Sequence, residues 1–381
     1  MEGPKLLKEI RLANLLSYGP EGAPISLEPL NVLIGPNASG KSNLISAIDF
    51  LAATPRDLPQ FFRAAGGIQE WLWQGGKPAP TASLAVVLET SIGSFRYDIR
   101  FTEHQLTPYV ESESLEEETG RPVFRLGLHR DGEEESYFEA PGALRNQSIF
   151  SQIKAPQAYP ELTLVGRELG RCRFFRDWNF GRDSAVRRPQ PADLPTDFLL
   201  EDASNLALVL SDLTNNHPRI KRLILEKLQL LYDRVEDVTV QVQGGTVQVF
   251  FHEKGLRRPV PASRLSDGTL MYLCLLTILL HPSPPPLVCL EEPEIGLHPD
   301  ALHEVAELLL DAATRTQLVV TTHSDILVSS LSEVPEAVVV CERGEGGTSL
   351  RRLEPDKLAE WLERYRLGEL WLMGEIGGTR W

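Results

Sequence analysis

Hydrophobic and polar positions follow two different periods along this chain, which predicts a mixture of strands and helices. The N-terminal part has the pattern of two strands, residues 6–16 and 25–34, and the second ends in the apolar run Leu30 to Ile34. A glycine-rich turn follows at once, and residues 43–53 then have a helical pattern. This strand, turn and helix predict the start of an α/β fold.

The middle of the chain carries a β-rich segment followed by a helical one. Residues 82 to about 139 form short alternating segments separated by polar turns, which predicts an antiparallel meander. The acidic clusters at 116–118 and 131–135 are expected to be solvated hairpin tips. Leucines at helical spacing predict helices over residues 201–212 and 218–232. These helices are too short for coiled-coil arms.

The C-terminal part returns to an α/β pattern. A hairpin turn at Gly244 and Gly245 joins residues 238–242 with residues 247–251. A second series of strands and helices then runs from residue 265 to 340.

Composition and charge restrict the class of protein. With 381 residues, 42% hydrophobic and 24% charged, the chain can bury a large core, which excludes global disorder and fibrous architectures. The 38 basic and 53 acidic residues give a charge of −15, which argues against coating nucleic acid or anionic lipid. The apolar run 269–280 is too short for a membrane span, and residues 1–10 lack a secretory signal. We therefore expect a cytoplasmic protein with no membrane contact and with reduced cysteines.

One motif indicates nucleotide binding. Residues 35–42 satisfy the pattern G-x-x-x-x-G-K-[ST] between the predicted strand and helix. Backbone N–H groups of such a loop wrap phosphates, and the following helix points its positive end at them. We expect Lys41 to neutralise the β- and γ-phosphates and Ser42 to ligate Mg²⁺. The predicted phosphate-binding residues are Gly35, Pro36, Asn37, Ala38, Ser39, Gly40, Lys41, Ser42 and Asn43.

Two further strand ends carry groups suited to hydrolysis. The apolar strand 287–290 leads into Glu291, assigned to the Mg²⁺ side, and Glu292, assigned as the general base. A second β-rich run, residues 317–320, leads to His323, which can donate a hydrogen bond to the γ-phosphate or the attacking water. Lys41, Glu292 and His323 are therefore the predicted catalytic residues.

A second anion site is predicted where residues 265–269, Leu-Ser-Asp-Gly-Thr, open the apolar helix 270–280. A serine, a glycine and a free helix N-terminus suit a phosphate. Because this site has no phosphate loop of its own, the simplest assignment is the nucleotide of a partner chain.

In this order, the motifs resemble those of ABC-type ATPase heads of the SMC/RecF-like group. They look more closely like stand-alone bacterial AAA ATPases related to the ATPase half of OLD-family nucleases, on residues 265–269, 291–299, 321–324, 368–371 and 374–378. The resemblance implies an α/β P-loop ATPase head with ATP and Mg²⁺ as cofactors. Its mixed sheet is flanked by helices, next to an antiparallel β lobe and a helical lid-like insertion without coiled-coil arms. The expected segments are 1–81 and 235–381 for the head, 82–165 for the β lobe, and 166–234 for the arginine-rich and helical insertion.

The resemblance also implies an ATP-dependent head-to-tail homodimer, in which Ser266, Asp267 and Gly268 of one protomer close over the ATP held by the other. Two departures leave the rate and the dimer affinity open: Glu291 stands where the wider class usually has aspartate, and Asp267 replaces the usual signature glycine. The wider class has a glutamine that senses Mg²⁺, and the sequence does not choose among Gln60, Gln69, Gln74, Gln152 and Gln157.

Residues 166–188 form the one strongly basic stretch, with seven arginines against three acids and interleaved aromatic residues. It is the candidate DNA contact, and the alternative is a basic loop at the dimer interface or paired with the acidic hairpins. The candidate arginines are Arg171, Arg173, Arg176, Arg182, Arg187 and Arg188.

The leading function is an ATP-hydrolysing switch that acts on DNA or a partner effector in DNA repair and maintenance or anti-phage defence. The C-terminus lacks the acidic strands of a nuclease domain, so any nuclease would be a separate chain. The alternatives are the ATP-binding subunit of a membrane transporter and a regulatory protein that binds ATP without hydrolysing it. The 225 residues between Lys41 and Ser266 argue against the transporter, and intact Lys41, Glu292 and His323 argue against the regulatory protein.

Overall fold

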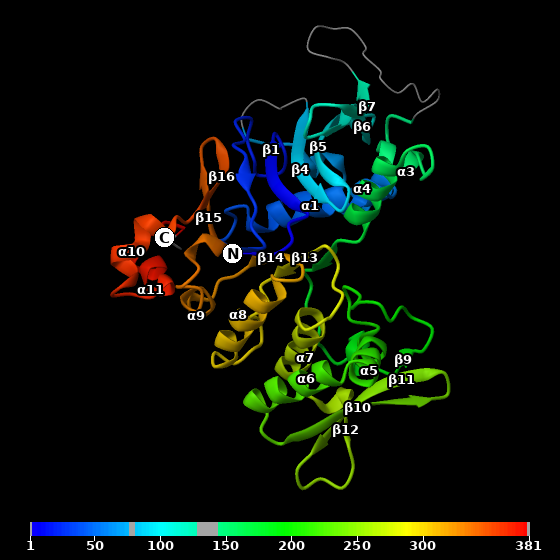
Figure 1. The fold of residues 1–381 in the computed structure, drawn as a ribbon, viewed down its shortest axis with the longest axis vertical. Helices are drawn as coiled ribbons and strands as arrows, with labels where there is room; N and C mark the ends of the chain where they lie inside the picture. The colour runs from blue at the N-terminus through cyan, green and yellow to red at the C-terminus, as the bar shows by residue number, and fades with distance from the viewer. Residues whose placement is uncertain (1, 76–80, 128–143, 379–381) are drawn as a thin grey trace.

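The computed structural model describes residues 2–75, 81–127 and 144–378, and its centre is a six-stranded sheet in the order β16-β15-β3-β14-β13-β8 (Figure 1). Five of its strands run parallel, and β16 is the antiparallel edge strand. The strands are β3 (Leu30–Ile34), β8 (Arg173–Phe175), β13 (Leu287–Glu291), β14 (Gln317–Thr321), β15 (Val338–Gly344) and β16 (Gly347–Arg352).

The central strands are apolar on both faces because each face is covered by a separate core. Val32 and Val320 face one hydrophobic cluster, whereas Leu33 and Val319 face the other. Buried parallel strands have this continuous apolar sequence. The pattern that predicted strands 30–34, 287–290 and 317–320 therefore also marks the middle layer of the fold.

One face of the central sheet is covered by helix α1 (Lys41–Ala53) and by an antiparallel sheet in the order β2-β1-β4-β5-β6-β7 (Figure 1). The strands of this sheet are β1 (Leu7–Ala13), β2 (Ile25–Ser26), β4 (Ala82–Thr90), β5 (Gly93–His104), β6 (Thr107–Glu117) and β7 (Pro122–Gly127). The helices beside it are α2 (Leu58–Ala64), α3 (Ile149–Gln152) and α4 (Pro160–Gly170).

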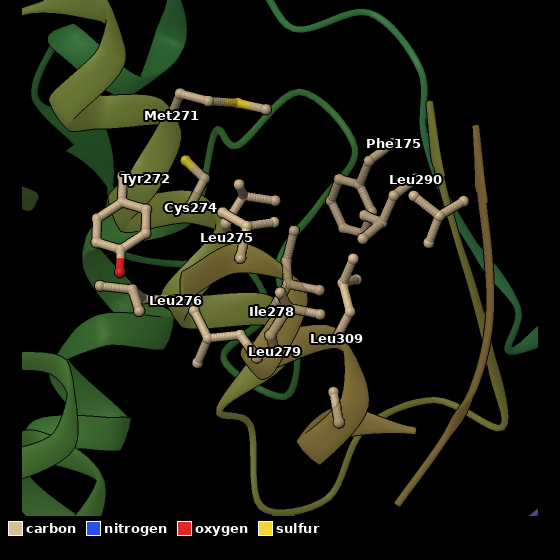
Figure 2. Packing of buried hydrophobic residues seen from close by; sticks show 14 of the residues in the cluster. Phe175, Met271, Tyr272, Cys274, Leu275, Leu276, Ile278, Leu279, Leu290 and Leu309 are labelled. Atoms are coloured by element: carbon tan, nitrogen blue, oxygen red, sulfur yellow. The ribbon is translucent and has the colours of Figure 1, made fainter. Parts of the chain in front are cut away.

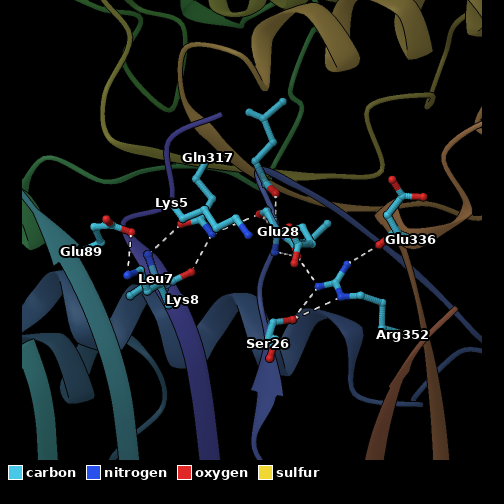
Figure 3. Close-up of polar contacts among 11 residues, drawn as sticks. Lys5, Leu7, Lys8, Ser26, Glu28, Glu89, Gln317, Glu336 and Arg352 are labelled. Carbon is cyan, nitrogen blue, oxygen red and sulfur yellow. Dashed lines mark hydrogen bonds and ion pairs between the residues drawn. The ribbon is translucent and has the colours of Figure 1, made fainter. Parts of the chain in front are cut away.

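Two polar side chains, buried Gln317 and half-buried Arg352, join the two sheets (Figure 3). Gln317 at the start of β14 accepts a hydrogen bond from Leu7 N at 2.8 Å and donates one to Leu7 O at 2.7 Å. Arg352 in β16 donates to Ser26 O at 2.7 Å and to Asn31 Oδ1 at 2.6 Å. Because buried backbone groups need partners, these contacts fix the start of β1 and the strand β2 against the central sheet.

The other face is covered by α7 (Asp267–Leu279) and α8 (Ala301–Ala312). Figure 2 shows Leu275, Ile278 and Leu279 of α7 packed beside Leu290 and Leu309. Helix α7 is apolar all round because it is buried on every side. A lower lobe packs against it, formed by α5 (Leu206–Asn216), α6 (Pro218–Leu231), β9 (Gln190–Pro191), β10 (Val235–Gln243), β11 (Thr246–Glu253) and β12 (Val260–Pro261).

The C-terminal residues return to the head. Helix α11 (Leu367–Met373) packs on α9 (Asp325–Ser329), and α10 (Pro355–Leu362) precedes it. Gly368 allows this close packing, since a Cβ there would lie 2.1 Å from Asp325 O. In the part of the chain that the structure describes, no helix combines the length and apolarity that a bilayer crossing requires.

Two predicted elements have different bounds in the structure. Residues 25–34 form two strands in two sheets, β2 and β3, because the chain turns at Glu28, whose N–H and C=O both bond the Asn31 side chain. Helix α5 begins at Leu206 rather than 201, because the Asn205 side chain bonds the backbone of Pro195, Phe198 and Leu200.

The acidic cluster 116–118 is not simply a solvated hairpin tip. Glu116 and Glu117 lie inside β6 and pair with Arg125 and Arg121. Residues 131–135 lie outside the described residues. The segment boundaries stay a prediction, although residues 173–175 of the third segment form β8 of the central sheet.

Candidate functional site

Three strands bring the predicted chemical groups to one edge of the central sheet. The parallel register places Leu33 of β3 opposite Thr321 of β14, and Thr321 opposite Glu291 of β13. The loops that leave the carboxyl ends of these strands therefore start side by side, which is where parallel α/β sheets bind ligands. They contain the phosphate loop, Glu292 and His323.

The phosphate loop is shaped by two glycines in left-handed conformations, Gly35 with φ 148° and Gly40 with φ 104°. A Cβ at Gly35 would lie 2.2 Å from Cys341 O, and one at Gly40 would lie 2.3 Å from Thr348 Oγ1. No side chain caps the N-terminus of α1, so its first N–H groups remain for an anion. The loop thus has the backbone cradle that a triphosphate needs.

Lys41 lies within this cradle. Its side chain is buried, and its Nζ donates to Gly35 O at 2.8 Å and to Pro36 O at 3.0 Å. The same ammonium group can pair with phosphate oxygens, which are stronger, charged acceptors. The residues present therefore fit ATP.

The loop is supported by residues that the sequence did not indicate. Thr348 in β16 donates to Ser39 O at 2.9 Å, and the Tyr18 hydroxyl donates to Gly40 O at 3.1 Å. A Cβ at Gly378 would lie 3.3 Å from Gly35 Cα. Both ends of the chain therefore pack around the phosphate loop.

The predicted Mg²⁺ side of the site, formed by Ser42 and Glu291, also holds Arg176, which the sequence placed among the candidate DNA contacts. Arg176 follows β8 and donates to Glu291 Oε1 at 2.8 Å, to Ser46 Oγ at 2.8 Å and to Ser42 O at 3.4 Å. One guanidinium thus joins both predicted Mg²⁺ residues, Ser42 and Glu291. A hydroxyl and a carboxylate beside phosphates are a donor set that fits Mg²⁺.

Glu292 and His323 form a pair. The distance from His323 Nε2 to Glu292 Oε1 is 3.5 Å. Glu292 has a left-handed backbone with φ 47°, a costly conformation for a residue with a side chain. The Glu292 N–H donates to Thr321 O at 3.0 Å, which holds that conformation. Such strain is common where a side chain must face a reacting group.

Glu294 positions the histidine loop and was not singled out by the sequence. Its Oε1 accepts hydrogen bonds from Thr322 Oγ1 and from His323 N, both at 2.7 Å. Its Oε2 is buried without a hydrogen-bond partner among the described residues. Burial raises the pKa of Glu294, the Thr322 and His323 bonds oppose that rise, and nearby Glu292 adds to it.

We expect Glu294→Gln to be more stable than the wild type in mildly alkaline buffer. Because the pKa of Glu294 is raised in the folded state, folding favours its protonated form, and stability is lost as pH rises through that pKa. Glutamine keeps an acceptor for Thr322 and His323 and carries no charge. Urea unfolding at about pH 5 and about pH 8 should therefore show a growing advantage for the variant.

Exposed Glu363 provides the control. Glu363→Gln should retain the pH dependence of wild-type stability. If Glu294→Gln were more stable than the wild type by the same free energy of unfolding at both pH values, the raised pKa of Glu294 would be contradicted.

The predicted signature, residues 265–269, lies at the N-terminus of α7, and we call it the signature turn. Ser266 is the N-cap and accepts a hydrogen bond from Thr269 N at 3.0 Å. A Cβ at Gly268 would lie 2.6 Å from Gly296 O, so the signature turn packs on the loop that follows Glu292. Ser266 and Asp267 are exposed to solvent.

The six candidate DNA arginines do not share one environment. Arg176 joins the Mg²⁺ side of the site, and Arg187 is buried with its guanidinium on the signature turn. Arg173 is half-buried, with Nη1 donating to Arg171 O and Cys172 O. The exposed members are Arg171, Arg182 and Arg188. Arg176 and Arg187 are therefore withdrawn from the predicted DNA surface.

Three of the five candidate glutamines bond groups away from the predicted Mg²⁺ residues. Gln69 pairs with Glu103, Gln74 with Gln69 O, and Gln152 with Leu144. Gln60 lies in α2, and Gln157 lies in the loop before α4. Arg176 occupies the position that contacts both Ser42 and Glu291.

Comparisons with solved structures identify the fold. An Smc head bound to the C-terminal winged-helix domain of ScpA matches with a TM-score of 0.61 and 16% identity, over 93% of this chain and 100% of that one. An Smc head domain with an extended coiled coil, bound to the C-terminal domain of ScpA and derived from Pyrococcus furiosus, matches with a TM-score of 0.60 and 14% identity, over 94% and 98%. A search of curated protein sequences finds no match.

Comparison with family models identifies the family. Residues 30–329, well over half of the chain, match the model described as "AAA domain, putative AbiEii toxin, Type IV TA system". The predicted SMC-head-like P-loop fold is confirmed, and no long coiled coil occurs in residues 2–75, 81–127 and 144–378. The chain therefore belongs to this AAA family and has the fold of an SMC-type ATPase head.

Proposed function

We propose that this protein is an ATP-hydrolysing switch in which two copies join head-to-tail around ATP and separate after hydrolysis. The joining of the two copies would act on DNA or on a partner effector. The observation that carries the proposal is that Lys41, Glu292 and His323 converge at one sheet edge, while Ser266 stands exposed at a separate helix N-terminus.

In each protomer, different residues would bind the phosphates, hold Mg²⁺ and activate water. The N–H groups at the start of α1 and the Lys41 ammonium bind the phosphates. Ser42 and Glu291 would hold Mg²⁺, which neutralises charge on the phosphates when bound. Glu292 would accept a proton from the attacking water, and His323, 3.5 Å away, would orient that water or the γ-phosphate. Fixed strand ends supply the positioning on which phosphoryl transfer depends.

The signature supports the dimer. Ser266 is the exposed N-cap of the 13-residue helix α7, and the N-terminal end of a helix attracts phosphate. Its helix is packed against the lower lobe, whereas Lys41 belongs to the opposite face of the central sheet. In a head-to-tail pair, each signature can close over the nucleotide held by the other protomer.

The family description favours anti-phage defence over DNA repair as the setting, because it names a toxin of a toxin–antitoxin system. The exposed arginines Arg171, Arg182 and Arg188 are the remaining candidates for DNA contact. The relation to OLD-family proteins and a separate nuclease chain stay predictions.

The test is the oligomeric state with and without nucleotide. Sedimentation velocity at micromolar concentration should show a monomer without nucleotide and with ADP, and a dimer with ATP and Mg²⁺. Ser266→Arg places a bulky cation at the signature, so it should retain ATP binding and lose the dimer. The matched control is Ser91→Arg, at an exposed serine in the hairpin between β4 and β5. A wild type that hydrolyses ATP while remaining monomeric would contradict the head-to-tail mechanism.

A further inference from the structure

The buried arginine Arg187 lies against the signature turn. We infer that Arg187 is a positioning residue that holds the signature turn in the shape needed to close over the partner's ATP. The inference rests on the proposed head-to-tail dimer, and it replaces the prediction that Arg187 contacts DNA. Its basis is a set of hydrogen bonds around one guanidinium.

Every nitrogen of the Arg187 guanidinium has a partner. Nε donates to Phe180 O at 2.6 Å, and Nη1 donates to Leu265 O at 2.6 Å. Nη1 also lies 3.4 Å from Ala262 O and from Ser263 O. Nη2 pairs with the Asp267 carboxylate. The Arg187 side chain is 9% exposed, so these contacts occupy a group that water scarcely reaches.

These contacts hold the residues on both sides of Ser266. Leu265 and Asp267 are the immediate neighbours of Ser266, and the Leu265 carbonyl and the Asp267 carboxylate both bond the Arg187 guanidinium. Ser266 itself has the extended backbone of an N-cap, with φ −67° and ψ 157°. A guanidinium presents its donors in a fixed plane, which an ammonium cannot reproduce. Arg187 therefore fixes the direction in which the Ser266 N-cap presents the helix end.

Arg187 also neutralises the negative charge of Asp267, which is unfavourable at a site for phosphate. Asp267 puts a carboxylate next to Ser266, where a partner's phosphates would approach, and like charges repel. The buried Arg187 guanidinium pairs with the Asp267 carboxylate and so reduces its repulsion of the partner's phosphates. This pairing accounts for an aspartate at a position where the resemblance implies glycine.

The segment that carries Arg187 is held at its other end by the Mg²⁺ side of the same protomer. Trp178 Nε1 donates to Glu291 O at 2.6 Å. The Trp178 ring stacks between Phe175 and Phe180, with centroid distances of 5.8 Å and 6.2 Å. Phe180 then accepts the Arg187 Nε bond. A continuous series of contacts thus joins Glu291 to the signature turn.

The test uses mixed dimers, because Arg187 would act on the partner's site while Lys41 acts on its own. Arg187→Ala alone should lower ATP turnover at least about tenfold, since several bonds to a charged group are lost. Binding of fluorescent ATP to the monomer should stay within about twofold of the wild type, because the phosphate loop is intact. Mixing Arg187→Ala with inactive Lys41→Ala should restore turnover to roughly a quarter of the wild-type value, since half of the pairs then contain one intact site of two.

Two reference pairs separate this inference from the proposed function. Ser266→Arg with Lys41→Ala should restore turnover if the dimer is head-to-tail. Glu292→Gln with Lys41→Ala should not, because both residues serve their own protomer's nucleotide. If the first pair fails, the proposed dimer is overturned.

If that reference pair succeeds while Arg187→Ala with Lys41→Ala stays inactive, the role of Arg187 is overturned. Wild-type turnover by Arg187→Ala alone would also overturn the role of Arg187. Arg187→Lys covers the case in which the alanine variant does not fold, because it keeps a cation for Asp267 and loses the planar fork. It should be defective alone and restored by Lys41→Ala, and wild-type turnover or a failed restoration would again overturn the role.

Discussion

Lys41→Ala is expected to weaken ATP binding by about 10- to 100-fold, because one or two charged hydrogen bonds to phosphate are lost. In the structure, the Lys41 ammonium lies within the phosphate loop and bonds Gly35 O and Pro36 O. Removing it leaves the glycine turns and the helix end in place, so the loss should fall on nucleotide binding. Titration with a fluorescent ATP analogue measures this effect directly.

Lys357→Ala is the matched control, because the Lys357 ammonium is exposed and pairs with neighbouring Glu354. It should bind ATP as the wild type does. The thermal midpoint of Lys41→Ala without nucleotide should be compared as well, so that loss of binding is distinguished from loss of the fold. Unchanged ATP affinity in folded Lys41→Ala would exclude this loop as the triphosphate site.

Glu292→Gln is expected to lower ATP turnover by about 10²- to 10⁴-fold, the usual contribution of a general base. The amide cannot accept a proton from water, but it keeps nearly the shape of the carboxylate. Its left-handed backbone is held by Thr321, so the substitution should not move the loop. Single-turnover phosphate release should fall while ATP affinity remains, and the ATP-bound dimer should therefore accumulate.

Glu375→Gln, at an exposed position in the C-terminal segment, is the control for loss of one carboxylate. It should release phosphate at the wild-type rate. His323→Ala should also reduce turnover, since His323 Nε2 is 3.5 Å from Glu292 Oε1. Near wild-type phosphate release by Glu292→Gln would remove Glu292 from the role of base and leave the His323 loop as the source of water activation.

The sequence predicted the strands at the centre of the fold because their signal is local and strong. The predicted runs 30–34, 287–290 and 317–320 are mostly apolar, as expected for strands covered on both faces, and they coincide with β3, β13 and β14. The phosphate loop follows from eight adjacent residues, so its glycines and Lys41 could be recognised directly. The break at residues 27–29 was missed because strands 25–26 and 30–34 are so close in sequence that they were joined across Glu28 and Pro29. In the structure, the Asn31 side chain bonds the backbone N–H and C=O of Glu28, where the chain turns.

In the arginine-rich segment, the structure places the candidate arginines in different environments, which the composition of the segment does not indicate. Seven arginines among aromatic residues have the composition of a nucleic-acid surface, and composition does not distinguish an exposed guanidinium from a buried one. Arg176 and Arg187 find their partners 115 and 78 residues away, at Glu291 and Leu265. Packing of β8 beside β13 brings Arg176 to Glu291, and packing of residues 185–187 on residues 262–264 brings Arg187 to Leu265.

The sequence by itself determined that this chain has a triphosphate loop, because the conformation of such a loop depends on the glycines and the helix within it. It also indicated which strand ends carry Glu292 and His323. The tertiary structure decided what surrounds them: Arg176 on the Mg²⁺ side, Glu294 beneath His323, and Arg187 on the signature turn. The physical reason is that a charged side chain takes its role from the partners and the burial that the fold gives it, and these come from distant parts of the chain.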